Sequence, residues 1–197
     1  MLSVLRKPVQ IYIATTLVLI RSGKDCWCLN RSPTLPLSEA LDGLNDEIAK
    51  LKLGRFRRAG VFLSAALCPP LIGQDSNADI APHVLQAIEH WALNIGFLPS
   101  DIRPLWSVCT ELPDAKSDEI HGFYLTEPDS STALIRSLDG SAVCHSMDDF
   151  DDVETALNDL CQQHQLDPAS LLKWRFNSTA AESDVPAHVW RQHWERL

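Results

Sequence analysis

Two stretches of the chain repeat one another: residues 16–29 read TLVLIRSGKDCWCL, and residues 131–144 read STALIRSLDGSAVC. The tetrapeptide LIRS at positions 19–22 returns at positions 134–137. Four shared residues can arise by chance, so the segments that follow each copy decide whether the repeat has structural meaning. Both copies are followed by the same succession of hydrophobic patterns, which predicts the same succession of secondary structure.

The first copy begins in a run rich in Ile, Val and Thr, residue types that favour strands. We expect one strand over 9–21, or two short strands joined at 14–16. Ser22-Gly23-Lys24-Asp25 has the composition of a turn, and a returning strand is expected over 26–30. Leucine and isoleucine then recur at helical spacing between 37 and 51, with Ser38 as N-cap and Gly54 as the end. The apolar run 58–68, RAGVFLSAALC, predicts a buried strand.

The second copy has the same order. Strands are expected over 121–127 and 131–137, followed by a turn at 138–140 and a returning strand over 141–146. Phe150, Val153, Leu157 and Leu160 form a helical stripe, for which Asp151 and Glu154 make a capping box. The segment LLKWRFNS, residues 171–178, predicts a strand. Each unit is therefore a β-hairpin followed by a helix and a strand. The repeat indicates a duplicated α/β unit, with mixed sheets flanked by helices.

The segments between and after the copies complete the predicted organisation. A helix is expected over 80–95, capped by Asn77 and ended by Gly96, and a strand over 103–112. Residues 113–119, PDAKSDE, have the composition of a linker, so we predict one domain over 1–112 and a second, smaller domain over 120–197. The C-terminal segment 183–197 predicts a final helix with Pro186 in its first turn.

The predicted order of elements resembles the duplicated ribonuclease-H-like fold of actin-like proteins. RRAGVFLSAALCPPLIG at 57–73, followed by a long helix, is similar to the first half of the bacterial assembly proteins PilM, of type IV pili, and GspL, whose cytoplasmic part belongs to type II secretion. HGFYLTEPDSSTALIRSLDGSAVCHS at 121–146 looks like the strand–turn–strand that opens their second half. The resemblance covers most of residues 9–180 and rests on element order rather than on an invariant motif. It implies two tandem, degenerate actin-like units.

The nucleotide residues of actin-like ATPases have no counterpart in the two hairpins. The resemblance implies an Asp and a Gly-rich turn in each opening hairpin, where backbone amides cradle phosphate and the carboxylate acts through a metal ion. IYIATTLVLI at 11–20 contains neither acid nor glycine, and YLTEPDSSTALI at 124–135 keeps Asp129 but lacks glycine. We therefore expect no ATPase activity and no cofactor. Two-metal nuclease chemistry also requires carboxylates on the first strand, and residues 9–20 contain none.

Charge is distributed unevenly along the chain. Net charge is -9, which disfavours general nucleic-acid binding because phosphates require a basic surface. Residues 1–100 contain 10 bases and 8 acids, whereas residues 101–197 contain 7 bases and 18 acids. Such asymmetry can steer a protein partner, although a solvated acidic surface has the same composition. The apolar run near the N-terminus is too short to span a bilayer, and it ends in Arg21 without the small residues of a cleavage site, so we expect neither an anchor nor a signal peptide. Buried, reduced cysteines predict a cytoplasmic protein, whose membrane association would come through a partner.

The six cysteines are expected to be reduced, and most of them buried. Cys26 and Cys28 share one face of the predicted strand, and with Cys144 or His145 in a paired hairpin they could bind a metal ion. An enzyme with a cysteine or metal centre around Cys26, Cys28 and Cys144 is therefore the alternative hypothesis. Cys68 is a weaker nucleophile candidate, and Ser64 lacks the glycines of a nucleophile elbow.

Two clusters are candidates for binding another protein. Arg55, Arg57 and Arg58 form the densest basic cluster, in GRFRRAG. Trp190, Trp194 and Leu197 recur at helical spacing near the C-terminus, and tryptophan is common at interface hot spots. Our first hypothesis is a non-catalytic interaction module, a scaffold or assembly factor of a bacterial pilus or secretion machine whose partner would be a membrane-anchored component of the same machine. A homo-oligomer assembled through the tryptophans is the third hypothesis.

Overall fold

A computed structural model describes residues 9–54, 56–70, 80–107, 120–136, 142–146, 153–177 and 194–196. The chain divides into two units. The first unit contains Met1–Leu63 and Asp79–Arg103, and the second contains Ser64–Ala78 and Pro104–Leu197. The linker predicted at 113–119 lies outside the described residues.

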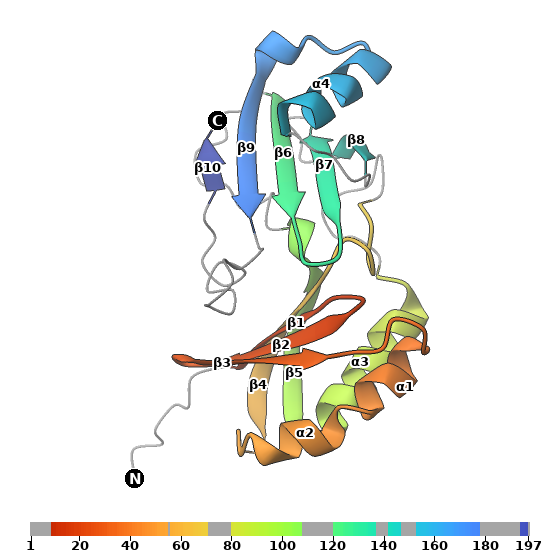
Figure 1. Ribbon diagram of the computed structural model, residues 1–197, viewed down its shortest axis with the longest axis vertical. Coiled ribbons are helices and arrows are strands. Elements are labelled where there is room, and N and C mark those ends of the chain that lie inside the picture. Colours follow the sequence, from red (N-terminus) through yellow and green to blue (C-terminus); the bar gives the residue numbers. More distant parts are fainter. Residues whose placement is uncertain are drawn as a thin grey trace. The chain divides into compact units, whose positions relative to one another are not determined.

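The first unit contains a five-stranded mixed sheet in the order β3-β2-β1-β4-β5 (Figure 1). Its central strand β1 pairs antiparallel with β2, Ile11 opposite Ile20, and parallel with β4, Ile11 opposite Val61. β2 pairs antiparallel with β3. The strands are β1 (Val9–Ile13), β2 (Leu17–Ser22), β3 (Asp25–Asn30), β4 (Arg57–Leu63) and β5 (Phe97–Pro104).

Among the described residues, the helices that accompany this sheet are α1 (Leu37–Asp42), α2 (Asn45–Lys50) and α3 (Pro82–Asn94). α1 packs against α3 (Figure 1). The fully buried side chains of the unit include Ile11, Leu41, Ile88 and Trp91, so strand and helix residues are buried together. Burial of these apolar side chains is the main favourable contribution to the stability of the unit.

The second unit contains a sheet with the equivalent order, β10-β9-β6-β7-β8. β6 takes the place of β1: it pairs antiparallel with β7, Phe123 opposite Leu134, and parallel with β9, Phe123 opposite Trp174. β7 pairs antiparallel with β8, with a bulge between Ile135 and Arg136, and β9 pairs antiparallel with β10. The strands are β6 (Ile120–Thr126), β7 (Ser131–Arg136), β8 (Ala142–Ser146), β9 (Leu171–Asn177) and β10 (Trp194–Arg196).

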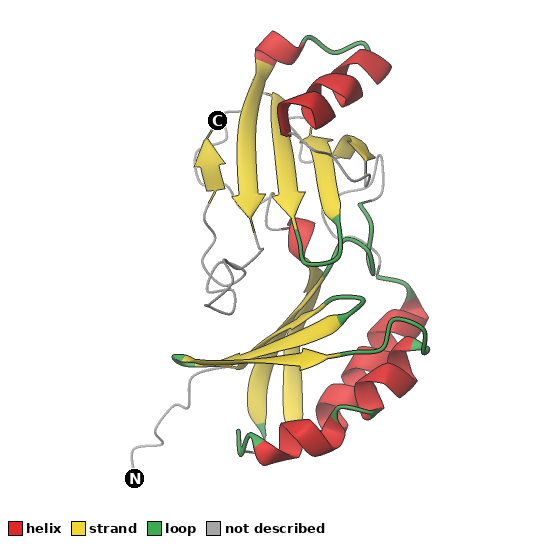
Figure 2. Ribbon diagram, viewed as in Figure 1, coloured by secondary structure: helices red, strands yellow, loops and turns green. Residues whose placement is uncertain are grey.

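The helix α4 (Val153–Gln163) packs across β6, β7 and β8 (Figure 2). Its buried residues Ala156, Leu157, Leu160 and Cys161 form one core cluster with residues of the sheet and with Leu171. The sequence repeat falls on equivalent strands, because 19–22 lies in β2 and 134–136 lies in β7. The prediction of two tandem units with the order hairpin, helix and strand is therefore confirmed.

Several predicted elements have different bounds. The helix expected over 37–51 is two short helices that meet around Gly43, and α1 begins after Pro36 without a side-chain cap from Ser38. The strand expected over 58–68 ends at Leu63. Asn77, predicted to cap α3, and Asp151, predicted to cap α4, lie outside the described residues.

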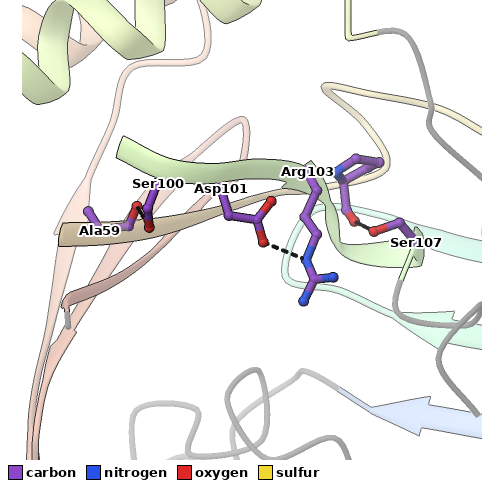
Figure 3. Close-up of polar contacts among 6 residues, drawn as sticks. Ala59, Ser100, Asp101, Arg103 and Ser107 are labelled. Carbon is purple, nitrogen blue, oxygen red and sulfur yellow. Dashed lines mark hydrogen bonds and ion pairs between the residues drawn. The ribbon is translucent and has the colours of Figure 1, made fainter. Parts of the chain in front are cut away.

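The strand expected over 103–112 is also wrong in its bounds, because β5 begins directly after α3. Gly96 adopts a φ of +86°, which allows the chain to reverse at once. Residues 105–107 form a 3-10 turn in which Ser107 Oγ donates to Pro104 O at 2.7 Å. Within β5, Arg103 Nε lies 3.3 Å from Asp101 Oδ2, and Ser100 Oγ donates to Ala59 O on β4 (Figure 3).

Two further expectations are wrong. Trp194–Arg196, predicted as part of a final helix, form β10 instead, because the edge of β9 offers backbone groups with which this segment can pair. Cys28, expected to be buried, is exposed, since it lies on the edge strand β3, where Leu29 turns inward. Cys68 and Cys161 are buried as predicted.

Candidate functional site

The opening hairpin of each unit is the place where the predicted relationship puts ligand-binding groups. In the first unit this hairpin joins β1 to β2 through residues 14–16, and Ala14 N donates to Leu17 O at 2.9 Å. Arg31, which follows β3, is buried against this bend. Its backbone amide donates to Thr16 O at 2.7 Å, and its guanidinium Nη1 donates to Ala14 O at 2.5 Å. The first bend is therefore held by a cation of the same chain.

In the second unit the bend between β6 and β7 is closed by a hydrogen bond from Glu127 N to Ser130 O, at 2.8 Å. Both acidic side chains of this bend accept hydrogen bonds from the residues that follow β4. Glu127 Oε2 accepts from the backbone amide of Ala65 at 3.0 Å, and Asp129 Oδ2 accepts from Ser64 Oγ at 3.1 Å. Glu127 is 4% exposed, so it accepts from this amide in a buried environment, where an amide without an acceptor would be costly.

The segment that receives these carboxylates is itself a compact turn. The amides of Leu67 and Cys68 both donate to Ser64 O at 3.0 Å. Trp106 Nε1 then donates to Cys68 O at 2.7 Å. Ser64 and Ala65 are fully buried. The Ser64 hydroxyl is therefore a donor inside the fold, a role that its sequence context does not reveal.

The thiol of Cys68 lies in the same turn, and burial raises the pKa of the Cys68 thiol above its ordinary value. A raised pKa leaves less of the reactive thiolate near neutral pH. The surroundings of the Cys68 thiol therefore do not support its interpretation as a nucleophile.

The candidate cysteine centre does not have the pairing expected for it. Cys26 and Cys28 lie on β3 of the first sheet, whereas Cys144 lies on β8 of the second sheet, paired with Ile135. Within the described parts of the chain, no group of three or more His, Cys, Asp or Glu residues is arranged to hold a metal ion.

The structure places three of the six candidate partner-binding residues. Arg57 is half-buried at the start of β4, where its Nη1 donates to Ser22 Oγ at 2.8 Å and to Leu53 O at 3.1 Å. Arg58, the next residue, is exposed. Trp194 begins β10. Arg55, Trp190 and Leu197 lie outside the described residues. Arg57 thus joins three segments of the first unit, while Arg58 remains available to solvent.

Sequence reasoning singles out the arginines of GRFRRAG but not the phenylalanine between them. Phe56 is 78% exposed and has a φ of +59°, which is unusual for an aromatic residue. Its amide donates to Gly96 O at 2.6 Å. No local signal in the sequence identifies it, because its exposure depends on the fold around it.

No helix among the described residues is long and apolar enough to cross a membrane. No family model matches the sequence, and no curated protein matches it. Solved structures do match.

A protein of unknown function from Bacteroides thetaiotaomicron with an actin-like ATPase fold matches over 91% of this chain and 84% of its own, at 7% identity and a TM-score of 0.54. The ethanolamine utilization protein EutJ from Carboxydothermus hydrogenoformans matches over 72% of this chain and 51% of its own, at 11% identity and a TM-score of 0.39. MreB5 of Spiroplasma citri bound to ADP matches over 73% and 52%, at 12% identity and a TM-score of 0.41. This chain spans about half the length of the last two. Strand order and the first of these similarities together show that the chain has an actin-like, ribonuclease-H-like α/β fold.

Proposed function

We propose that this protein is a non-catalytic protein-binding module built on an actin-like fold. The observation that carries the proposal is the use of the second hairpin: its two carboxylates accept hydrogen bonds from Ser64 and from the amide of Ala65. Groups that bind the chain's own donors contribute to its stability and are not directed at a metal-bound phosphate.

The first hairpin supports the same proposal. Its bend presents a carbonyl oxygen to the Arg31 guanidinium, and it contains no glycine that would let backbone amides approach a phosphate. Both bends therefore serve the internal structure of their own unit. An actin-like unit whose bends are used internally still has outer surfaces with which it can bind other proteins.

The cellular setting that we propose is a bacterial pilus or secretion machine, in which the protein is a cytoplasmic scaffold or assembly factor for a membrane-anchored component. This part rests on the resemblance of 57–73 and 121–146 to PilM and to the cytoplasmic part of GspL. The acidic composition of residues 101–197 fits a surface that docks on a basic protein partner.

Phosphate release from ATP with magnesium, measured on the purified protein, tests the non-catalytic part of the proposal. We expect the wild-type protein to release no more phosphate than the Glu127→Gln variant. ATP turnover that is present in the wild type and lost in this variant would contradict the proposal. Elemental analysis addresses the alternative enzyme, because stoichiometric zinc or iron would favour a centre around Cys26, Cys28 and Cys144.

A further inference from the structure

The first unit has a groove between α2 and the end of α3. It encloses about 320 Å³ and is lined by Asn45, Ile48, Ala49, Lys52, Leu53, Gly54, Asn94, Ile95 and Phe97. Its apolar walls come from both helices and from the start of β5. Its lining contains one basic residue, Lys52, and no acidic one. The groove therefore combines a mixed polar and apolar lining with a positive charge.

Phe56 lies at the edge of this groove. Its amide is bonded to Gly96 O, between the lining residues Ile95 and Phe97. An exposed aromatic side chain at the edge of a groove is a feature found at protein-binding surfaces.

The backbone beside the groove adopts an unfavourable conformation. Lys52 and Phe56 have φ values of 52° and 59°, in the left-handed region that side chains with a Cβ rarely occupy. Each such residue costs about 1 kcal/mol or more relative to a right-handed conformation. Strain of this kind is often found where a side chain must be presented to a ligand. Here it holds the Phe56 ring in solvent.

The charge around the groove indicates what would bind there. Residues 50–58, KLKLGRFRR, contain five bases and no acid. Lys50, Lys52 and Arg58 are exposed. Asp46 and Glu47 lie one turn earlier on α2, but neither lines the groove. An approaching acidic segment would therefore meet positive charge at the groove itself.

We infer that this groove binds an acidic segment of another protein, with one large apolar side chain of that segment entering between α2 and α3 and a carboxylate meeting Lys52. Phe56 would pack on the segment from the edge of the groove. Aromatic and basic side chains together are the composition found at interface hot spots. The inference rests on the proposed function, since it gives the same protein-binding module a second, basic surface in the first unit, separate from the acidic residues 101–197, and names the chemistry of what binds there.

The test uses random peptides displayed on phage and selected on the full chain. We expect the enriched peptides to combine acidic residues with a large apolar residue. One enriched peptide, synthesised with a fluorophore, is then titrated with the protein by fluorescence anisotropy. Phe56→Gly, whose backbone tolerates a positive φ, and Lys52→Glu are each expected to weaken binding about tenfold or more. Leu35→Ser is the matched control, because Leu35 is 45% exposed but does not line the groove, and it should leave the affinity unchanged.

Three outcomes would overturn the inference. The first is selection of peptides without acidic residues, and the second is that Phe56→Gly and Lys52→Glu bind the peptide as tightly as Leu35→Ser does. The third is self-association of the chain that Phe56→Gly abolishes. The last would assign the groove to a second copy. Peptide binding elsewhere on the chain would overturn the inference but leave the proposed function in place, whereas ATP turnover would contradict the proposed function whatever the peptides do.

Discussion

The carboxylate of Glu127, in the bend between β6 and β7, accepts a hydrogen bond from the backbone amide of Ala65, 62 residues earlier in the chain, at 3.0 Å. Asp129 in the same bend accepts from Ser64. The hairpin and the turn after β4 are therefore joined by two side-chain bonds that no local sequence pattern signals. Because both carboxylates bind donors of their own chain, the bend supports the fold.

Replacing Glu127 tests the structural role of this bond. Glu127→Ala leaves a buried amide without its acceptor, and we expect the free energy of unfolding to fall by about 1–3 kcal/mol. Glu127→Gln retains an acceptor oxygen and should lose markedly less. Urea denaturation followed by circular dichroism measures both variants. Asp159→Asn, at an exposed position in the middle of α4, is the control and should change stability by less than about 0.5 kcal/mol. Equal stability of the Ala variant and the wild type would contradict the role assigned to Glu127.

Two strand glycines make a matched pair. A Cβ at Gly122 would lie 2.6 Å from Leu171 Cδ2 and 3.3 Å from Leu157 Cδ2, whereas a Cβ at Gly60 would meet nothing within 4 Å. We expect Gly122→Ala to destabilise the protein by about 1–3 kcal/mol through overpacking. Gly60→Ala should be neutral or slightly stabilising, because alanine restricts the unfolded chain.

The same denaturation measurement evaluates this pair. If Gly122→Ala proves as stable as Gly60→Ala, then α4 and Leu171 do not pack on β6 as closely as described.

Phe56 and Phe97 differ in what they contribute to the stability of the fold. Phe56 is 78% exposed with a positive φ, while Phe97 is 1% exposed. Phe56→Gly removes backbone strain but loosens the unfolded chain, so we expect stability to change by no more than about 1 kcal/mol. Phe97→Ala should cost about 3–5 kcal/mol because it removes a buried ring. Thermal unfolding measures the stability of both variants. A larger loss of stability in Phe56→Gly than in Phe97→Ala would contradict the assignment of Phe56 to the surface and Phe97 to the core.

Cysteine reactivity reports how exposed each thiol is. Cys28 is exposed and Cys68 is buried, and burial raises the pKa of both thiols. Because both pKa values are raised, exposure decides the difference, and Cys68 should react with iodoacetamide far more slowly than Cys28 in the native protein at mildly alkaline pH. Mass spectrometry of timed samples resolves the two sites. Faster labelling of Cys68 would mean that its thiol is accessible and activated.

The duplicated order of elements is predictable from the sequence, because alternating apolar residues and the turn at Gly23 are local signals. They locate β2 and β3 nearly to the residue. Prediction fails where long-range pairing decides the structure. Trp194 begins a strand because β9 offers backbone groups for pairing, although its spacing from Trp190 and Leu197 favours a helix. The start of β5 escapes prediction because the positive φ of Gly96 reverses the chain immediately.

The candidate site is less predictable than the fold. Asp129 is recognisable as an acid in the second hairpin, but its acceptance of a bond from Ser64 depends on segments far apart in the chain. The basic cluster at 55–58 is recognisable from composition. The exposure of Phe56 and the groove beside it are not, since both depend on how α2 meets the end of α3.

The two hairpin bends serve the fold of their own units, and on this basis we propose that they do not bind phosphate. The decisive experiment is isothermal titration calorimetry of the wild-type chain with ATP and magnesium. We expect no saturable heat at millimolar nucleotide. Saturable binding with a micromolar dissociation constant would show that a phosphate site exists and that the protein is not the non-catalytic module proposed.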